Sequence, residues 1–167
     1  MIKTVEDFEK LWIQESAITL SALKALTDDS LSQSIVDGHR TIGRIIWHIV
    51  TTIPEMTERI GLKLEGPSAN SPVPDNVEEI KNGYLQVSKS LLEIIKSKWT
   101  DEMFDLEDDM YGEKWKRGFT FQVLILHQVH HRAQMTVLMR QAGLQVPNLY
   151  GPSKEAWSSM GMKEPEV

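Results

Sequence analysis

Apolar residues recur at helical spacing in four long stretches of the chain, and polar segments containing glycine or proline separate them. The first stretch begins after Thr4, whose side chain can cap a helix together with Asp7, and extends to about Asp28. Residues 29–40 are polar and contain an Asp-Gly turn signal. The pattern therefore predicts one long helix followed by a loop.

The second stretch begins at Thr41, a residue type that caps helices, and ends at Gly61. Pro54 lies inside it and is predicted to kink the helix, because proline lacks the amide donor and clashes with the preceding turn. Residues 61–75 contain three prolines and two glycines. A connection of this length predicts a crossover rather than a tight hairpin.

The third stretch is predicted to begin with Asp75 as its cap, and it reaches about Lys98. Residues 99–119 mix acidic, aromatic and glycine residues, and they have room for a short extended piece. They show no clean alternation of apolar and polar residues that would mark a strand. Thr120 is predicted to open the fourth helix, which ends at Gly143. The tail predicts one more short helix, beginning near Pro152.

Four helices of about 20 residues with one long crossover are typical of an all-α four-helix bundle. An irregular all-helical domain is the alternative. The length of 167 residues is that of one ordinary domain, so we expect a single domain over residues 1–167.

The charge and composition exclude several classes of function. The net charge of −6 disfavours binding to nucleic acid or to an anionic membrane. The sequence contains no cysteine, which excludes disulfides, thiolate nucleophiles and sulfur-ligated metals. No stretch approaches the roughly 20 apolar residues of a membrane span, and acidic residues stand where a signal peptide would be apolar. We therefore expect a cytoplasmic protein.

The candidate chemistry lies in the fourth predicted helix, where histidines follow an apolar run. His127 and His131 are four residues apart, so they share one face of the helix. His48 lies in an equally apolar part of the second helix. Burial of imidazoles costs several kcal/mol unless each finds a partner, and either a divalent metal or a backbone carbonyl can be that partner. Three histidine ligands would leave coordination positions open, as catalytic metal sites do.

The other two histidines are expected outside this cluster. His39 lies in the polar loop and is expected to be solvated. His130 points about 100° away from its neighbour His131 around an ideal helix, so we expect it on the helix surface or beside a ligand.

Three further residues near the histidines have candidate roles. Glu55 follows His48 by seven residues, on the same side of an ideal helix, and is a candidate acid–base group. Arg132 and Gln134 either orient the ligands or lie in solvent. We expect residues 61–75 and 99–119 to shape the mouth of the site.

Three segments resemble one known family. Residues 41–50 read TIGRIIWHIV and resemble the second-helix histidine motif of the DinB/YfiT-like metalloenzyme family. Residues 127–134 read HQVHHRAQ and resemble its H-x-x-x-H-R-G-Q motif, with Ala133 where glycine is frequent. The ending Tyr-Gly-Pro-Ser at 150–153, followed by Trp157, is also similar to many members.

The resemblance implies a four-helix bundle of up-down-down-up topology, often a homodimer, with a divalent metal on His48, His127 and His131. Zinc, nickel and iron all suit neutral imidazole ligands. Related families use such a metal to activate a low-molecular-weight thiol, which implies a thiol-dependent S-transferase acting on a small molecule. A metal with open positions can also lower the pKa of bound water to about 7, so a metal-dependent hydrolase is the other candidate. A non-catalytic, stress-related bundle that binds a metal or another ligand is the alternative.

Overall fold

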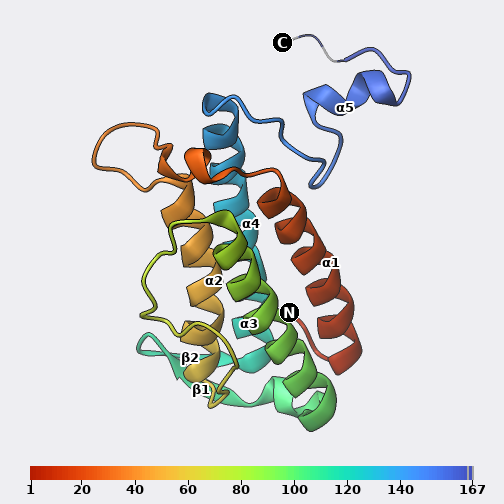
Figure 1. Cartoon of the computed structure of the whole chain (residues 1–167). Helices are drawn as coiled ribbons and strands as arrows, with labels where there is room; N and C mark the ends of the chain where they lie inside the picture. Colours follow the sequence, from red (N-terminus) through yellow and green to blue (C-terminus); the bar gives the residue numbers. More distant parts are fainter. Residues whose placement is uncertain (165, 167) are drawn as a thin grey trace.

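Four long helices lie side by side and make the protein mostly helical (Figure 1). The computed structural model describes residues 1–164 and residue 166. Helix α1 packs against α3 and α4, and α2 packs against the same two helices, so the four enclose one core. The long helices are α1 (Val5–Lys24), α2 (Ile42–Glu58), α3 (Val77–Lys98) and α4 (Arg117–Gln141).

The connection between α2 and α3 is the long crossover that the sequence predicts. Both helices begin near the short 3₁₀ helix η1 (Asp28–Ser32), where the Val77 amide donates to Asp28 and the Ile42 amide donates to the carbonyl of Gln33. Between them the chain returns along the outside of the helices (Figure 1). On this path the indole of Trp47 donates to the carbonyl of Ser71 at 2.8 Å.

The predicted caps of the first two helices are confirmed, and the third is wrong by one residue. Thr4 accepts from the amide of Asp7, and Thr41 accepts from the amide of Arg44. Helix α3 is capped by Asn76 instead of Asp75. The Asn76 side chain accepts from the Glu79 amide at 2.8 Å and donates to the Glu79 carboxylate at 2.7 Å. An aspartate could accept there but could not make the second contact.

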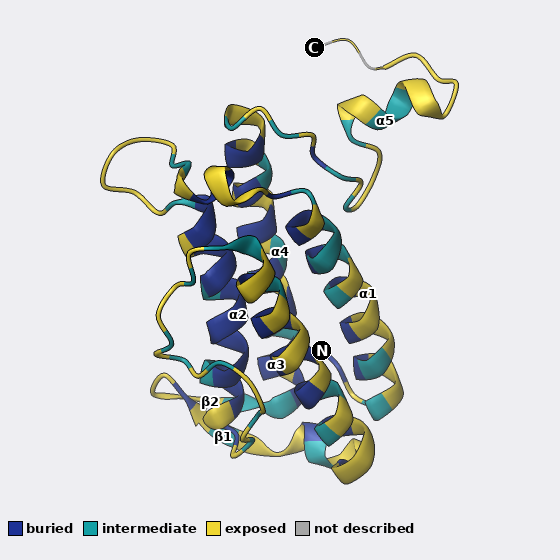
Figure 2. Cartoon of the chain, viewed as in Figure 1, coloured by how far each residue is buried: buried dark blue, intermediate teal, exposed yellow. Residues whose placement is uncertain are grey.

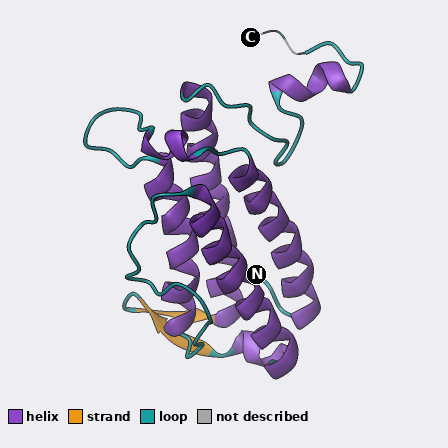
Figure 3. Cartoon of the chain, in the orientation of Figure 1, coloured by secondary structure: helices purple, strands orange, loops and turns teal. Residues whose placement is uncertain are grey.

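A small β-hairpin corrects both the all-α prediction and the start of the fourth helix. Strands β1 (Glu107–Met110) and β2 (Glu113–Lys116) pair antiparallel, with Glu107 opposite Lys116 (Figure 3). Helix α4 follows β2 at once and begins at Arg117 rather than Thr120, because the Arg117 amide is held by the carbonyl of Leu106. Of the eight strand residues only Met110 is buried, so no alternation marked the strands in the sequence.

The remaining ends differ little from the prediction. Helix α1 ends at Lys24, short of the predicted Asp28, because the chain turns there into η1. Gly143 follows α4 with a φ of +75°, a backbone conformation that favours glycine and ends helices. Two further elements complete the described chain, the 3₁₀ helix η2 (Asp101–Asp105) and the short C-terminal helix α5 (Lys154–Ser159).

Helix α2 is buried on most of its surface, as Figure 2 shows. This burial explains the apolar run that surrounds His48 in the sequence. The predicted domain extends to Val167, but residues 165 and 167 lie outside the described residues. None of the described helices is long and apolar enough to cross a membrane.

Candidate metal centre

Three histidines from two packed helices meet at one point. His48 comes from α2, while His127 and His131 come from successive turns of α4. One nitrogen of each ring lies within 4.8 Å of one nitrogen of each of the others. The ring centroids of His48 lie 4.9 Å from His127 and 4.8 Å from His131. The structure therefore brings together all three histidines that the sequence singles out.

The outer nitrogens of two rings are held by neighbouring side chains. The Nδ1 of His131 lies 2.7 Å from the amide oxygen of Gln134, which can only accept, so Nδ1 carries the proton. The hydroxyl of Thr52 donates to the carbonyl of His48 at 2.7 Å and accepts from the Nδ1 of that ring at 3.3 Å. Both contacts leave the Nε2 lone pair of the ring free for a ligand.

The inner nitrogens of His127 and His131 face each other. Their Nε2 atoms are 3.1 Å apart. Two lone pairs at that distance repel unless a proton or a cation lies between them. Tetrahedral zinc with bonds of 2.0–2.1 Å places two nitrogens about 3.3 Å apart, so the observed spacing fits a shared divalent ion.

Burial keeps these rings in the neutral form that binds metals. Desolvation, together with the neighbouring histidines and Arg40, lowers the pKa of His48 to about 4 and that of His127 to about 4. Desolvation also lowers the pKa of His131, although its hydrogen bond to Gln134 opposes the shift. At pH 7 all three imidazoles are therefore neutral, and no proton has to leave before a metal binds.

The two remaining histidines lie outside the cluster, as expected. His39 is exposed in the loop that precedes α2. His130 is exposed on α4, and its ring packs edge-on against His131 with centroids 5.0 Å apart. Gln134 is exposed as well, and its contact with His131 agrees with the expected role in orienting a ligand.

Glu55 lies two turns along α2 from His48 and is held at both carboxylate oxygens. Arg59 donates to one oxygen at 2.7 Å, and the hydroxyl of Tyr111 donates to the other at 2.7 Å. Burial and the adjacent carboxylate raise the pKa of Tyr111 to about 12, so this hydroxyl remains a donor. The charge of Glu55 also acts on His127 and opposes the lowering of its pKa, which places the carboxylate within electrostatic reach of the cluster.

A pocket of about 490 Å³ opens beside His131. Neither of the two loops expected at the mouth, residues 61–75 and 99–119, belongs to the lining of this pocket, although Tyr111 of the second loop contacts Glu55. Residues 69–73 instead line a separate pocket against Arg44, Trp47 and Thr51, on another face of α2. The side chains around the pocket come from the loop before α2, from α2 and from α4, and they are Ile35, His39, Arg40, Ile45, His131, Gln134, Val137 and Leu138.

Comparison with known proteins places this chain in a family. The profile of the DinB family matches residues 1–166. The chain belongs to the DinB family. It is 40% identical over its full 167 residues to "Uncharacterized protein YrdA" of Bacillus subtilis (strain 168), whose full length is also covered.

Solved DinB structures have the same fold. A DinB-like protein from Bacillus cereus ATCC 10987 is 45% identical, with a TM-score of 0.86 over 90% of this chain and 100% of that one. The DinB-like protein YjoA of Bacillus subtilis is 16% identical, with a TM-score of 0.67 over 87% of this chain and 99% of that one. The second likeness concerns the fold alone.

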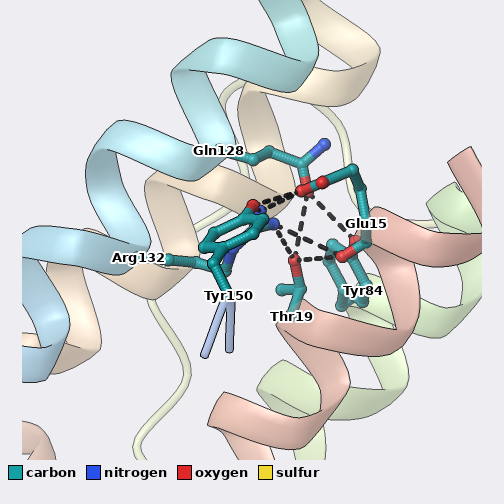
Figure 4. A network of polar contacts seen from close by, with 6 residues as sticks. All are labelled: Glu15, Thr19, Tyr84, Gln128, Arg132 and Tyr150. Carbon is teal, nitrogen blue, oxygen red and sulfur yellow. Dashed lines mark hydrogen bonds and ion pairs between the residues drawn. The ribbon is translucent and has the colours of Figure 1, made fainter. Parts of the chain in front are cut away.

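Arg132 of this DinB chain does not lie in solvent, so the expectation of a solvated side chain is wrong. Its side chain is fully buried on the side of α4 that faces α1, where it forms an ion pair with Glu15 (Figure 4). It also donates to the hydroxyl of Thr19 at 2.7 Å and contacts the hydroxyl of Tyr150. Tyr150 in turn donates to Glu15 at 2.5 Å.

Gln128 extends this polar network to α3. Its amide oxygen accepts from the hydroxyl of Tyr84 at 3.0 Å, and both side chains are fully buried (Figure 4). The network thus joins α1, α3, α4 and the segment before α5. Because Gln128 and Arg132 each follow a site histidine in the sequence, anchoring them fixes the rotation of α4 that points His127 and His131 at α2. Their spacing of four residues, directly after the apolar run at 123–126, was the available signal for this buried pair.

Proposed function

We propose that this DinB protein is a divalent-metal-dependent enzyme that acts on a small molecule, with His48, His127 and His131 as the metal ligands. The observation that carries the proposal is the convergence of three neutral imidazoles, of which His48 and His131 are held at Nδ1 so that their Nε2 atoms can bind a metal. Zinc, nickel and iron all suit such a set. Three protein ligands are the number that catalytic sites use, since closed structural sites use four.

A bound ion would supply Lewis-acid chemistry, lowering the pKa of a thiol or a water molecule so that its nucleophilic form exists at neutral pH. We prefer thiol transfer, in which the sulfur of a low-molecular-weight thiol bonds to an electrophilic carbon of the substrate and the leaving group departs with its electron pair. Since the chain has no cysteine, the thiol would be a second substrate. Metal-dependent hydrolysis is the second candidate, in which water takes the place of the thiol.

Glu55 would accept the proton that the nucleophile loses. Arg59 and Tyr111 hold its carboxylate in one orientation, because each donates a hydrogen bond to one of its two oxygens. Gln134 and Thr52 would keep the rings of His131 and His48 oriented while the substrate binds and leaves.

The proposal also concerns the topology of the helices and the oligomeric state of the protein. We infer that the four long helices form the up-down-down-up bundle of the family, as one domain in a homodimer located in the cytoplasm. The dimer would be measured by sedimentation equilibrium.

Elemental analysis and a substrate screen together test the activity. The purified protein is loaded with zinc, nickel or iron and assayed with 1-chloro-2,4-dinitrobenzene, epoxides and esters, each with and without cysteine, glutathione or coenzyme A. Turnover that needs both metal and thiol supports the transferase, and turnover that needs metal alone supports the hydrolase. His127→Ala should abolish either activity and retain the helical circular dichroism.

The non-catalytic alternative makes a different prediction. A bundle that only stores a metal or a ligand would turn over none of these substrates in any metal form. Glu55→Gln, which should lower the turnover of an enzyme, would then have no activity to change. Tight metal binding with no turnover across the panel would therefore favour the binding function.

A further inference from the structure

The pocket beside His131 combines an apolar body with one cationic side. Ile35, Ile45, Val137 and Leu138 form its apolar lining, and Ile35 and Val137 are 61% and 52% exposed. The polar lining consists of His39, Arg40, His131 and Gln134. No acidic side chain belongs to the described lining, although the chain as a whole carries a net charge of −6. The lining of the pocket is therefore cationic, whereas the protein as a whole carries a negative net charge.

Arg40 is available to a ligand. Among the described residues, the arginines that form ion pairs are Arg59, Arg117 and Arg132, so the guanidinium of Arg40 has no carboxylate partner. Its charge contributes to the lowered pKa of all three site histidines, whereas that of Arg44 contributes only for His48. Arg40 thus lies at the pocket and within electrostatic reach of the whole cluster.

We propose that this pocket binds a small amphiphilic carboxylate, with Arg40 as the residue that selects the anionic group. A guanidinium matches the two oxygens of a carboxylate in a bidentate arrangement, and its single positive charge balances the single negative charge of the carboxylate. The apolar lining takes the hydrocarbon part of the molecule. The proposal rests on the proposed function in one respect, since it identifies the bound molecule as the substrate.

The position of the Arg40 guanidinium explains why the pocket should prefer a carboxylate to a neutral molecule. A metal ion on the histidines and the guanidinium of Arg40 would repel each other, and an anion in the pocket would be attracted to both. A neutral molecule of the same shape would gain the apolar contacts only. The pocket is therefore expected to distinguish a carboxylate from its amide.

Binding to metal-free protein tests the selectivity without any turnover. Protein dialysed against EDTA is titrated with 4-phenylbutanoate and with 4-phenylbutanamide, and amide chemical shifts are followed by nuclear magnetic resonance. We expect the carboxylate to bind about 10-fold more tightly, in line with one exposed charge-assisted contact. The largest shift changes should fall on Ile35, Val137 and Gln134.

Matched variants decide whether Arg40 is the cause. Arg40→Gln should remove the preference for the carboxylate and leave the amide affinity within 2-fold, and Arg40→Lys should keep part of the preference. Arg44→Gln is the control, because this arginine lines the other pocket. Equal binding of the two probes to the unmodified protein, or a preference that survives Arg40→Gln, would overturn the proposal, and so would loss of amide binding in that variant.

Failure here and failure of the proposed function are separate results. The carboxylate preference is measured without metal, and metal affinity is measured without a carboxylate. A protein that binds zinc through its histidines and shows no preference between the probes would contradict only the pocket assignment.

Discussion

The Nε2 atoms of His127 and His131 lie 3.1 Å apart across one turn of α4, and both rings meet His48 of α2 at steep angles. Because Gln134 occupies the other nitrogen of His131, the short contact is favourable only with a proton or a cation between the two atoms. In the metal-free chain the neutral ring of His127 can supply that proton from its Nε2 atom. A divalent ion bound to the histidines would take the place of this proton.

The ligand set can be tested by removing one imidazole at a time. His48→Ala, His127→Ala and His131→Ala should each weaken zinc binding by more than about 100-fold, since even loss of a group that only orients a ligand costs 10–100-fold. Competition with a chromophoric chelator measures the affinity. His39→Ala and His130→Ala are the controls and should stay near the unmodified value. Loss of zinc from the His130 variant, with retention in the His131 variant, would refute the assignment.

The side chains that orient the rings should matter less than the ligands but still measurably. Gln134→Ala and Thr52→Val each free one imidazole from its outer contact, and we expect zinc affinity to fall about 10–100-fold. Gln134→Glu keeps an acceptor at the same place and should preserve the affinity. An unchanged affinity in both of the first two variants would show that the rings are oriented by packing alone.

The stability of the metal-free protein should fall as the pH drops from about 6.5 toward 4. His48 and His127 have a pKa of about 4 in the folded chain and 6.5 when unfolded. Between these values the unfolded state binds more protons, so acid favours unfolding, and above 6.5 neither state binds them. Urea denaturation at pH 7 and pH 5 measures the difference. His127→Ala should reduce this difference, because only His48 then contributes fully, and His39→Ala should leave it unchanged. A midpoint that does not depend on pH would contradict the assignment.

Removal of the metal should leave the helices intact. The core between the four helices is built from buried apolar residues, so folding does not depend on the ion. A ligand that binds only the folded state raises stability by mass action, and chelation should therefore lower the melting temperature modestly while the helical circular dichroism persists. Collapse of that signal on addition of EDTA would make the metal structural.

The buried ion pair of Arg132 and Glu15 should be costly to break from one side. Arg132→Met leaves the carboxylate of Glu15 buried without its cation, and we expect a loss of about 3–5 kcal/mol in the free energy of unfolding. The double variant Glu15→Met, Arg132→Met removes both charges and should recover most of the loss. Urea denaturation measures all three proteins.

A surface pair provides the control for that experiment. Lys10 and Glu6 form an exposed ion pair one turn apart on α1, so Lys10→Met should leave the free energy of unfolding nearly unchanged. If Arg132→Met were equally mild, the polar network could not be what holds α4 in its rotation.

Local interactions explain why much of this protein was predictable. Helix periodicity and the caps at Thr4 and Thr41 involve residues three or four positions apart, so the sequence carries them directly. The shared face of His127 and His131 follows from the same spacing. The hairpin escaped prediction because its strands are polar on both faces and are defined by pairing across a turn.

The sequence by itself determined which residues lie on helices, where most helices end and which imidazoles share a face. Only the tertiary structure decided what meets across helices, because packing brings together residues whose separation in the chain carries no signal. It brought His48 to His127 and His131, and it buried Arg132 against Glu15, 117 residues away. Local spacing decides a face, and the packing of one helix on another decides the partner.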